Sequence, residues 1–102
     1  MPVRTIRRRY LKFRVDSHDS VRERNVYDAI VNSVSSLYGI KGLSEAALRL
    51  IEYEGNEGII RCSHLQLRKV RSAIALISHL DGKVAAVHTL KAAGTLKSLR
   101  GK

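Results

Sequence analysis

The chain has 102 residues, a length typical of one domain. Hydrophobic residues make up 44% of it, which is enough for a packed core and excludes a globally disordered chain. The one cysteine excludes an intramolecular disulfide framework and fits a reducing compartment. No apolar run approaches the roughly 20 residues that a membrane-spanning helix needs. We therefore expect a cytoplasmic protein of a single domain, residues 1–102, with no membrane partner.

The formal net charge of +10 is distributed unevenly along the chain. Residues 1–14 contain six bases and no acid, residues 15–60 contain four bases and eight acids, and residues 61–102 contain nine bases and one acid. A basic arm of about residues 1–8 and a basic tail of about residues 95–102 therefore flank a more acidic middle. Such ends attract polyanions, because each neutralised phosphate releases counterions. The charge favours nucleic-acid contact over the alternative of bases that only solvate the surface.

The first half of the chain predicts a strand and then a helix. Residues 10–15 alternate between apolar and polar side chains, which is typical of a strand. Ser20 and Glu23 have the spacing of a capping box, and apolar residues then recur every three or four positions, as on a helix. Gly39 and Gly42 are predicted to end this helix, since glycine accepts the left-handed conformation of a helix C-terminus.

The second half predicts a hairpin, a helix and a last strand. Residues 46–54 and 59–65 read as two strands, and the glycines and asparagine of residues 55–58 form the turn between them. A second helix is predicted over residues 66–80, because buried-type side chains recur there at helical spacing. Residues 83–90 read as the last strand.

The resulting order is β-α-β-β-α-β, with a short C-terminal helix after Thr95. This order is typical of the ferredoxin-like α+β sandwich, which RNA recognition motifs share, with four antiparallel strands and two helices on one face. The helices are predicted to cover Leu11, Phe13, Val15, Leu48, Leu50, Ile60 and Cys62. The opposite face is predicted to hold Tyr10, Lys12, Arg14, Arg49, Ile51, Tyr53, Ile59 and Arg61. That mixture indicates cover by the tail, by another protein or by RNA.

Few residues are candidates for protein-borne chemistry. Cys62 and His64 lie two positions apart, but the sequence offers no third group to orient a nucleophile pair and no spacing for four zinc ligands. The nine carboxylates show no spacing typical of a metal-dependent nuclease. Base stacking in the style of an RNA recognition motif is disfavoured, because residues 58–64 contain no aromatic side chain. Contacts to phosphates and to RNA shape are the better expectation.

Four segments together resemble a known family. They are Arg9-Tyr10-Leu11-Lys12-Phe13, Leu50-Ile51-Glu52-Tyr53, Gly58-Ile59-Ile60-Arg61-Cys62 and Ala93-Gly94-Thr95-Leu96-Lys97. In order and spacing, the chain from about Arg8 to Lys97 resembles archaeal ribonuclease P protein component 2. The last motif of that family usually begins serine-glycine-threonine, and Ala93 replaces the serine here, so no role for a hydroxyl is carried over to this position.

The resemblance implies an accessory subunit of ribonuclease P. In that family the RNA of the holoenzyme removes the 5′ leader of precursor tRNA and uses magnesium ions, so we expect no cofactor and no active site in the protein. The implied partners are ribonuclease P RNA, ribonuclease P protein component 3, precursor tRNA through the complex, and a second copy of the chain through self-association. Two other functions stay open: a ferredoxin-like interaction module that binds acidic proteins without RNA, and a stand-alone nuclease.

The expected contact residues follow from the charge and from the two sheet faces. RNA contacts are predicted for Arg4, Arg7, Arg8, Arg9, Arg68, Lys69, Arg71, Lys97, Arg100 and Lys102. Ile51, Tyr53 and Ile59 are predicted to contact a protein partner, and contact with the chain's own tail is the alternative.

Overall fold

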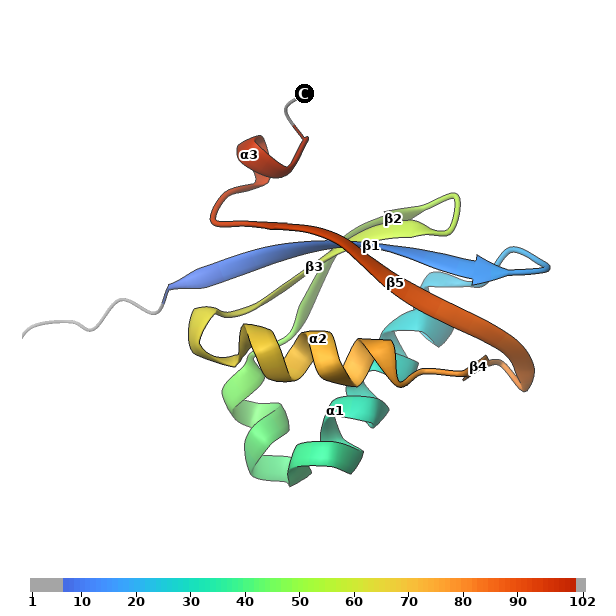
Figure 1. The fold of residues 1–102 in the computed structure, drawn as a ribbon, viewed down its shortest axis with the longest axis horizontal. Helices are drawn as coiled ribbons and strands as arrows, with labels where there is room; N and C mark the ends of the chain where they lie inside the picture. The colour runs from blue at the N-terminus through green and yellow to red at the C-terminus, as the bar shows by residue number, and fades with distance from the viewer. Residues whose placement is uncertain (1–6, 101–102) are drawn as a thin grey trace, which may run out of the picture.

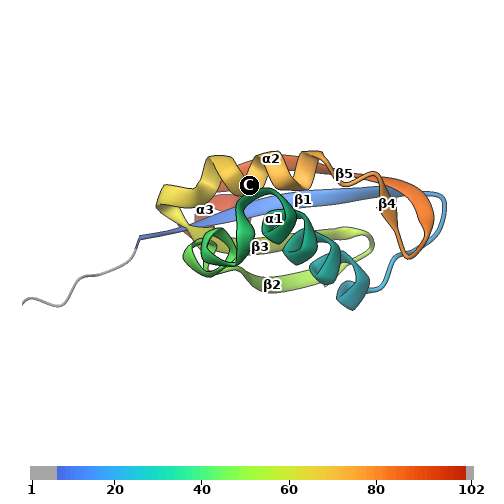
Figure 2. The same cartoon turned by 90° about the horizontal axis from the view of Figure 1, so that it is seen from below.

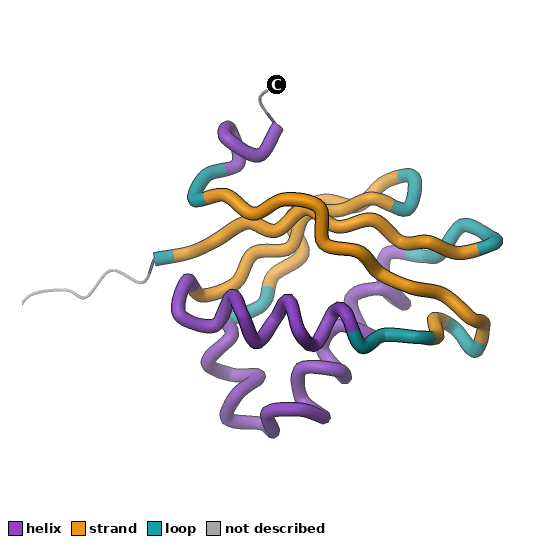
Figure 3. The backbone as a smooth tube through the Cα atoms, in the orientation of Figure 1, coloured by secondary structure: helices purple, strands orange, loops and turns teal. Residues whose placement is uncertain are grey.

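A computed structural model describes residues 7–100 of the chain. An antiparallel sheet carries helices α1 and α2 on one face and the short helix α3 on the other (Figure 1, Figure 3). The strand order in the sheet is β2-β3-β1-β5-β4. The first four strands in this order, with α1 and α2 on one face, form the predicted ferredoxin-like arrangement, so the fold class is confirmed.

The central strand β1 (Arg8–Ser17) pairs with β3 on one side and with β5 on the other. Strand β3 (Glu57–Ser63) also pairs with β2 (Arg49–Glu54), which forms one edge of the sheet. Strand β5 (Lys83–Ala93) is long and curved, and β4 (His79–Leu80) pairs only with its first two residues. Because β1 lies at the centre, each of its two ends borders both neighbouring strands of the sheet.

The second helix is shorter than predicted, which creates the fifth strand. A 3₁₀ turn (His64–Gln66) leads into α2 (Leu67–Ala75), so the helix ends five residues before position 80. The released residues reach β4, and Asp81 and Gly82, with φ of 54° and 77°, turn the chain into β5. Two successive positive φ angles are typical of a tight hairpin. The prediction of four strands missed β4, because two residues are too few to show an alternation.

Helix α1 (Glu23–Ala46) is longer than predicted. Gly39, with φ 75° and ψ −179°, interrupts the helical backbone, but the helix resumes beyond it. Gly39 therefore adopts the positive φ predicted for it and interrupts the helix at the predicted place, but neither glycine ends the helix. Helical residues resume after the kink, and Leu43 and Ala46 still reach the core. The predicted capping box is also absent, since the N-cap residue is Arg22 and no side chain bonds to the cap.

The core lies between the sheet and the pair α1 and α2, which cross it side by side (Figure 2). Its fully buried side chains are Leu11, Phe13, Ile60 and Cys62 from the sheet, Val26 and Ile30 from α1, and Val70, Ala73 and Ile74 from α2. The predicted helix-covered face is confirmed, with Leu48 and Leu50 half-buried at its rim. Burial raises the pKa of the Cys62 thiol to about 11, so it remains protonated at neutral pH.

A β-bulge in β2 moves Tyr53 to the helix-covered face. Leu50 pairs with Ile60 and Glu52 pairs with Ile59, so the residue between them is extra. Tyr53 consequently stacks on Phe13, with 6.2 Å between ring centroids. Its predicted position on the opposite face is wrong, because an alternation read from the sequence does not reveal a bulge.

Helix α3 (Leu96–Arg100) covers part of the opposite sheet face, and the predicted C-terminal helix is confirmed. The buried side chains beneath it are Ile59, Ala93 and Leu99, with Tyr10, Ile51 and Leu96 packed around them. Ile59 is only 3% exposed. The chain's own tail therefore provides part of the cover that the mixed composition of this face predicts.

Candidate nucleic-acid interface

The first residues of β1 and the start of α2 lie at the same end of the molecule (Figure 1, Figure 2). The backbone N–H of His64 donates to the carbonyl oxygen of Arg7 at 2.9 Å, which ties the turn before α2 to the start of β1. We call Arg7, Arg8, Arg9, Arg68, Lys69 and Arg71, the described cations of these two segments, the basic end. It combines predicted RNA-binding residues that are more than 50 positions apart in the sequence.

Within the basic end, Arg9 is the half-buried member with a defined partner. Its Nε donates to Nδ1 of His64 at 3.0 Å, which fixes the plane of the guanidinium group. Arg7, Arg8, Arg9 and Gly94 line a surface hollow, so the loop after β5 joins the basic end here. Neither His64 nor Gly94 was a predicted site residue. Only the resemblance could have pointed to Gly94, because it lies in the last matching segment.

The cations of α2 are all exposed on the first turns of the helix. The Lys69 ammonium lies 5.4 Å from the centroid of the Tyr38 ring, a cation–π contact that holds it against α1. No acidic residue occupies the first turn of α2. Since the positive end of a helix dipole disfavours cations, an anion bound beside Arg68 and Lys69 would relieve repulsion there.

The predicted RNA-binding cations near the C-terminus differ in their surroundings. Lys97 is exposed on α3. Arg100, also predicted to bind RNA, forms an ion pair with Glu52 of β2, and its contact with RNA stays a prediction. Arg4 and Lys102 lie outside the described residues.

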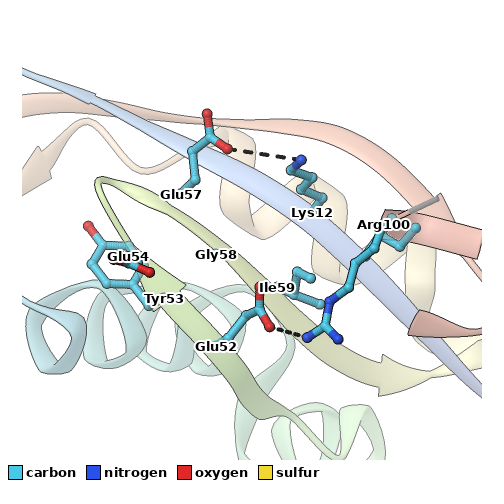
Figure 4. Close-up of a pocket in the computed structure, with 9 residues that line it drawn as sticks. Lys12, Glu52, Tyr53, Glu54, Glu57, Gly58, Ile59 and Arg100 are labelled. Atoms are coloured by element: carbon cyan, nitrogen blue, oxygen red, sulfur yellow. Dashed lines mark hydrogen bonds and ion pairs between the residues drawn. The ribbon is translucent and has the colours of Figure 1, made fainter. Parts of the chain in front are cut away.

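The surface between α3 and the β2–β3 hairpin is acidic (Figure 4). Glu52, Glu54 and Glu57 line a hollow there with Lys12 and Arg100. Figure 4 shows Glu57 facing Lys12, at 4.0 Å, and Glu52 facing Arg100. Its three carboxylates exceed its two cations, so this hollow does not suit a phosphate.

Some cations of the chain form ion pairs with acidic side chains, whereas those of the basic end do not. Within residues 7–100, the salt bridges are Lys12–Glu57, Lys83–Asp19, Arg100–Glu52 and the contact of His88 with Asp16. None of them includes a cation of the basic end or Lys97. Other described cations also lack an acidic partner, namely Arg14, Arg22, Arg24, Lys41, Arg49, Arg61 and Lys91. What distinguishes the basic end is that six cations without such a partner gather at one end of the molecule, which favours attraction of an external polyanion.

The three predicted protein-contact residues lie in two different environments. Ile51 and Ile59 pack in the cluster that α3 covers, which agrees with the alternative of a tail contact. Tyr53 lies on the other face, where its hydroxyl donates to the carbonyl oxygen of Val21 at 2.8 Å, and burial raises its pKa. The structure therefore does not bring the three together, and their contact with a partner stays a prediction.

Two further features bear on function. No helix among residues 7–100 is long and apolar enough to cross a membrane. In the same span, no group of three or more histidine, cysteine, aspartate or glutamate side chains is arranged to hold a metal ion.

Comparison with known proteins decides the family. The model of the Rpp14/Pop5 family matches residues 9–102. The chain belongs to this family. It is 33% identical to ribonuclease P protein component 2 of Methanosarcina acetivorans over 97 residues, which cover 95% of this chain and 74% of that relative. It is also 33% identical to the protein of that name from Archaeoglobus fulgidus over 96 residues, covering 94% of this chain and 87% of that relative.

A solved structure supports the same fold. A chain in the cryo-EM structure of yeast ribonuclease MRP superposes with a TM-score of 0.74 at 20% identity, covering 92% of this chain and 79% of that one. Together, the family match and this likeness confirm the resemblance on which the predicted fold and the predicted RNA–protein complex depend.

Proposed function

We propose that this family member is a non-catalytic protein subunit of ribonuclease P that binds the catalytic RNA through its basic end. The single observation that carries the proposal is the gathering of cations without an acidic partner around the start of β1, on a chain whose relatives are ribonuclease P proteins. Such cations neutralise backbone phosphates and position a protein on RNA without reading its bases.

Phosphate contact is favoured over base stacking by the positions of the aromatic side chains. Phe13, on the central strand, is fully buried against the helices. Tyr10, on the opposite face of that strand, packs into the cluster beneath α3. In an RNA recognition motif, aromatic side chains of the central strands must be open to stack on bases.

The finer parts of the proposal concern partners and conditions. Ribonuclease P protein component 3 is the expected protein partner, precursor tRNA is contacted through the complex, and a second copy of the chain is a further expected partner. The expected compartment is the cytoplasm. The magnesium ions of the reaction would bind to the RNA, and the protein would supply cations that reduce repulsion between RNA phosphates.

A reconstitution tests this function. The purified chain is mixed with its ribonuclease P RNA and a precursor tRNA, with and without component 3, in magnesium buffer. RNA-dependent removal of the 5′ leader that the two proteins together stimulate is the expected result. Cleavage by the chain alone would instead show a nuclease, and absence of RNA binding would favour the module that binds acidic proteins.

A further inference from the structure

The hollow at the start of β1 has an arginine that is already oriented. The hydrogen bond from Nε of Arg9 to His64 holds one side of the guanidinium group. Its Nη1 lies toward the loop after β5, within 3.5 Å of where a Cβ atom on Gly94 would be. A guanidinium held on one side loses less side-chain entropy when its other nitrogens bind an anion.

Among the described glycines, only Gly94 has neither a positive φ angle nor a neighbour too close for a Cβ atom. Gly39, Gly55 and Gly82 have positive φ angles. A Cβ on Gly42 or Gly58 would come within 2.4 Å or 2.7 Å of a neighbouring side chain. Gly94 has neither constraint, and among residues 7–100, apart from its two chain neighbours, only Nη1 of Arg9 lies within 4 Å of an added Cβ. The effect of the glycine is therefore to leave the guanidinium of Arg9 uncovered.

Three arginines border this uncovered position. Arg7 and Arg8 are exposed and line the hollow together with Arg9 and Gly94. No salt bridge within residues 7–100 neutralises any of the three. The planar donor fork of arginine matches the two free oxygens of a phosphodiester, and glycine lets a ligand approach the backbone closely.

We propose that Arg7, Arg8, Arg9 and Gly94 form a site for one backbone phosphate of RNA, with His64 as the residue that positions Arg9. The site deepens the proposed function, on which it rests: it names one built contact within the basic end, in which a single phosphate faces the Arg9 fork. Arg68 and Lys69, both exposed on α2, then contact other phosphates through charge alone, with Lys69 held against the Tyr38 ring.

The first test places a carboxylate in the hollow. Gly94→Asp puts an anion where the phosphate would bind, and Ser36→Asp makes the same change in charge at an exposed position of α1. We expect Gly94→Asp to weaken binding of the full chain to its ribonuclease P RNA by about 10- to 100-fold and to lower the salt slope by about one. Ser36→Asp should change the affinity by less than about 3-fold.

The second test keeps the charge and removes the fork. Arg9→Lys loses the planar donors and the bond to His64, and Arg24→Lys is the matched change at an exposed position of α1. We expect Arg9→Lys to weaken RNA binding by about 5-fold with a nearly unchanged salt slope, and Arg24→Lys to leave the affinity unchanged. Gly94→Ala serves as a folding check: its thermal midpoint should equal or exceed that of the wild type, because its Cβ meets only ordinary contact at 3.5 Å.

The outcomes separate the site from the function. If the wild type binds RNA with a steep salt slope but Gly94→Asp and Arg9→Lys behave like their controls, the phosphate site is wrong and the proposed function stands. If the wild type itself shows no RNA binding, both are overturned. Weaker binding by Gly94→Asp and Arg9→Lys but not by their two controls, with thermal midpoints retained, supports the site.

Discussion

The two ends of β1 handle charge in opposite ways. Near its last residues, Asp19, in the loop that follows, pairs with Lys83 at 3.2 Å, and Asp16 lies 3.7 Å from Nε2 of His88. At its first residues, Arg7, Arg8 and Arg9 have no acidic partner among the described residues. Neutralised pairs at a surface contribute little to stability and little field. Cations without acids leave a positive field that steers a polyanion to one end of the molecule.

The C-terminal end of β1, with the loop that carries Asp19, is also held by neutral hydrogen bonds. Asn56, at the tip of the β2–β3 hairpin, accepts from the N–H of Val21 at 3.0 Å, and its own carbonyl oxygen accepts from the N–H of Val15 at 2.6 Å. These bonds join the hairpin to the loop after β1. The contacts of this end stabilise the fold, and the proposed function assigns the other end to RNA.

The largest expected effect comes from removing three arginines from the basic end. Substituting Arg7, Arg8 and Arg9 with glutamine should weaken RNA binding by roughly 100-fold near physiological salt and lower the salt slope by about one, for the phosphate contact that the three side chains share. Filter binding over a range of salt concentrations measures both quantities.

A matched triple variant serves as its control. Glutamine at Arg14, Arg22 and Arg24, all exposed and outside the basic end, removes the same charge. It should change the affinity by less than about fivefold. Equal losses in the two triple variants would mean that net charge alone attracts RNA, and the comparison between the ends would no longer hold.

The second prediction concerns the pH dependence of stability, which tests whether water reaches the core around Cys62. Cys62 pairs in register with Arg9, yet its thiol pKa is raised to about 11 from 9.0 by burial. Above pH 9 the unfolded chain loses this proton and the folded chain keeps it, so stability should fall as pH rises toward 11, by up to about 1.4 kcal/mol per pH unit. Urea unfolding at several pH values measures this loss.

Cys62→Ala isolates that contribution. Its free energy of unfolding should depend less on pH between 9 and 11 than that of the wild type, because the titrating group is gone. Identical pH dependence in the two proteins would show that the thiol ionises freely in the folded state and that water reaches this part of the core.

A smaller effect is expected at the tip of the β2–β3 hairpin, which contacts the C-terminal end of β1. Asn56→Gly keeps the positive φ of 63° accessible but removes the acceptor for Val21. We expect a loss of about 1 to 2 kcal/mol in the free energy of unfolding, because a partly buried N–H loses its partner. RNA affinity should stay within about 2-fold. A change in the salt slope would show that this end also contacts RNA.

The smallest effect is expected from Glu52→Gln. The change frees Arg100 from its ion pair and removes one acid from the hollow in Figure 4. Because both side chains are about half exposed, stability should change by no more than about 0.5 kcal/mol. RNA binding should strengthen by about 2-fold, as Arg100 becomes available. Weaker binding would mean that the pair positions α3 for RNA.

Regular patterns in the sequence predicted most of the fold. The alternation around Phe13, the hairpin turn at Asn56 and the helical stripe around Ile74 each follow from a local period. The kink at Gly39 and the bulge at Ile51 did not, because each depends on contacts with distant residues: Leu43 and Ala46 reach the core past the kink. The bulge alone moved Tyr53 away from Ile51 and Ile59.

The sequence predicted the positive charge of the candidate site but not the spatial arrangement of its residues. The arginines near the N-terminus are plain in the sequence, yet their convergence with α2 depends on the bond between Arg7 and His64. The ion pair that engages Arg100 likewise depends on where α3 lies over β2. Gly94 could not be recognised as part of a site until the fold showed that no backbone constraint requires glycine there.

Footprinting of the cations in the RNA complex tests the central claim most directly. The full chain is treated with arginine- and lysine-specific reagents with and without its ribonuclease P RNA, and modification is measured by mass spectrometry. We expect protection of the basic end, namely Arg7, Arg8, Arg9, Arg68, Lys69 and Arg71, and of Lys97, the exposed cation of α3. Arg22, Arg24 and Lys83 should react equally in both states, since they lie outside the basic end. Protection of Lys83 and Arg24, with Arg9 and Lys69 still reactive in the complex, would contradict it.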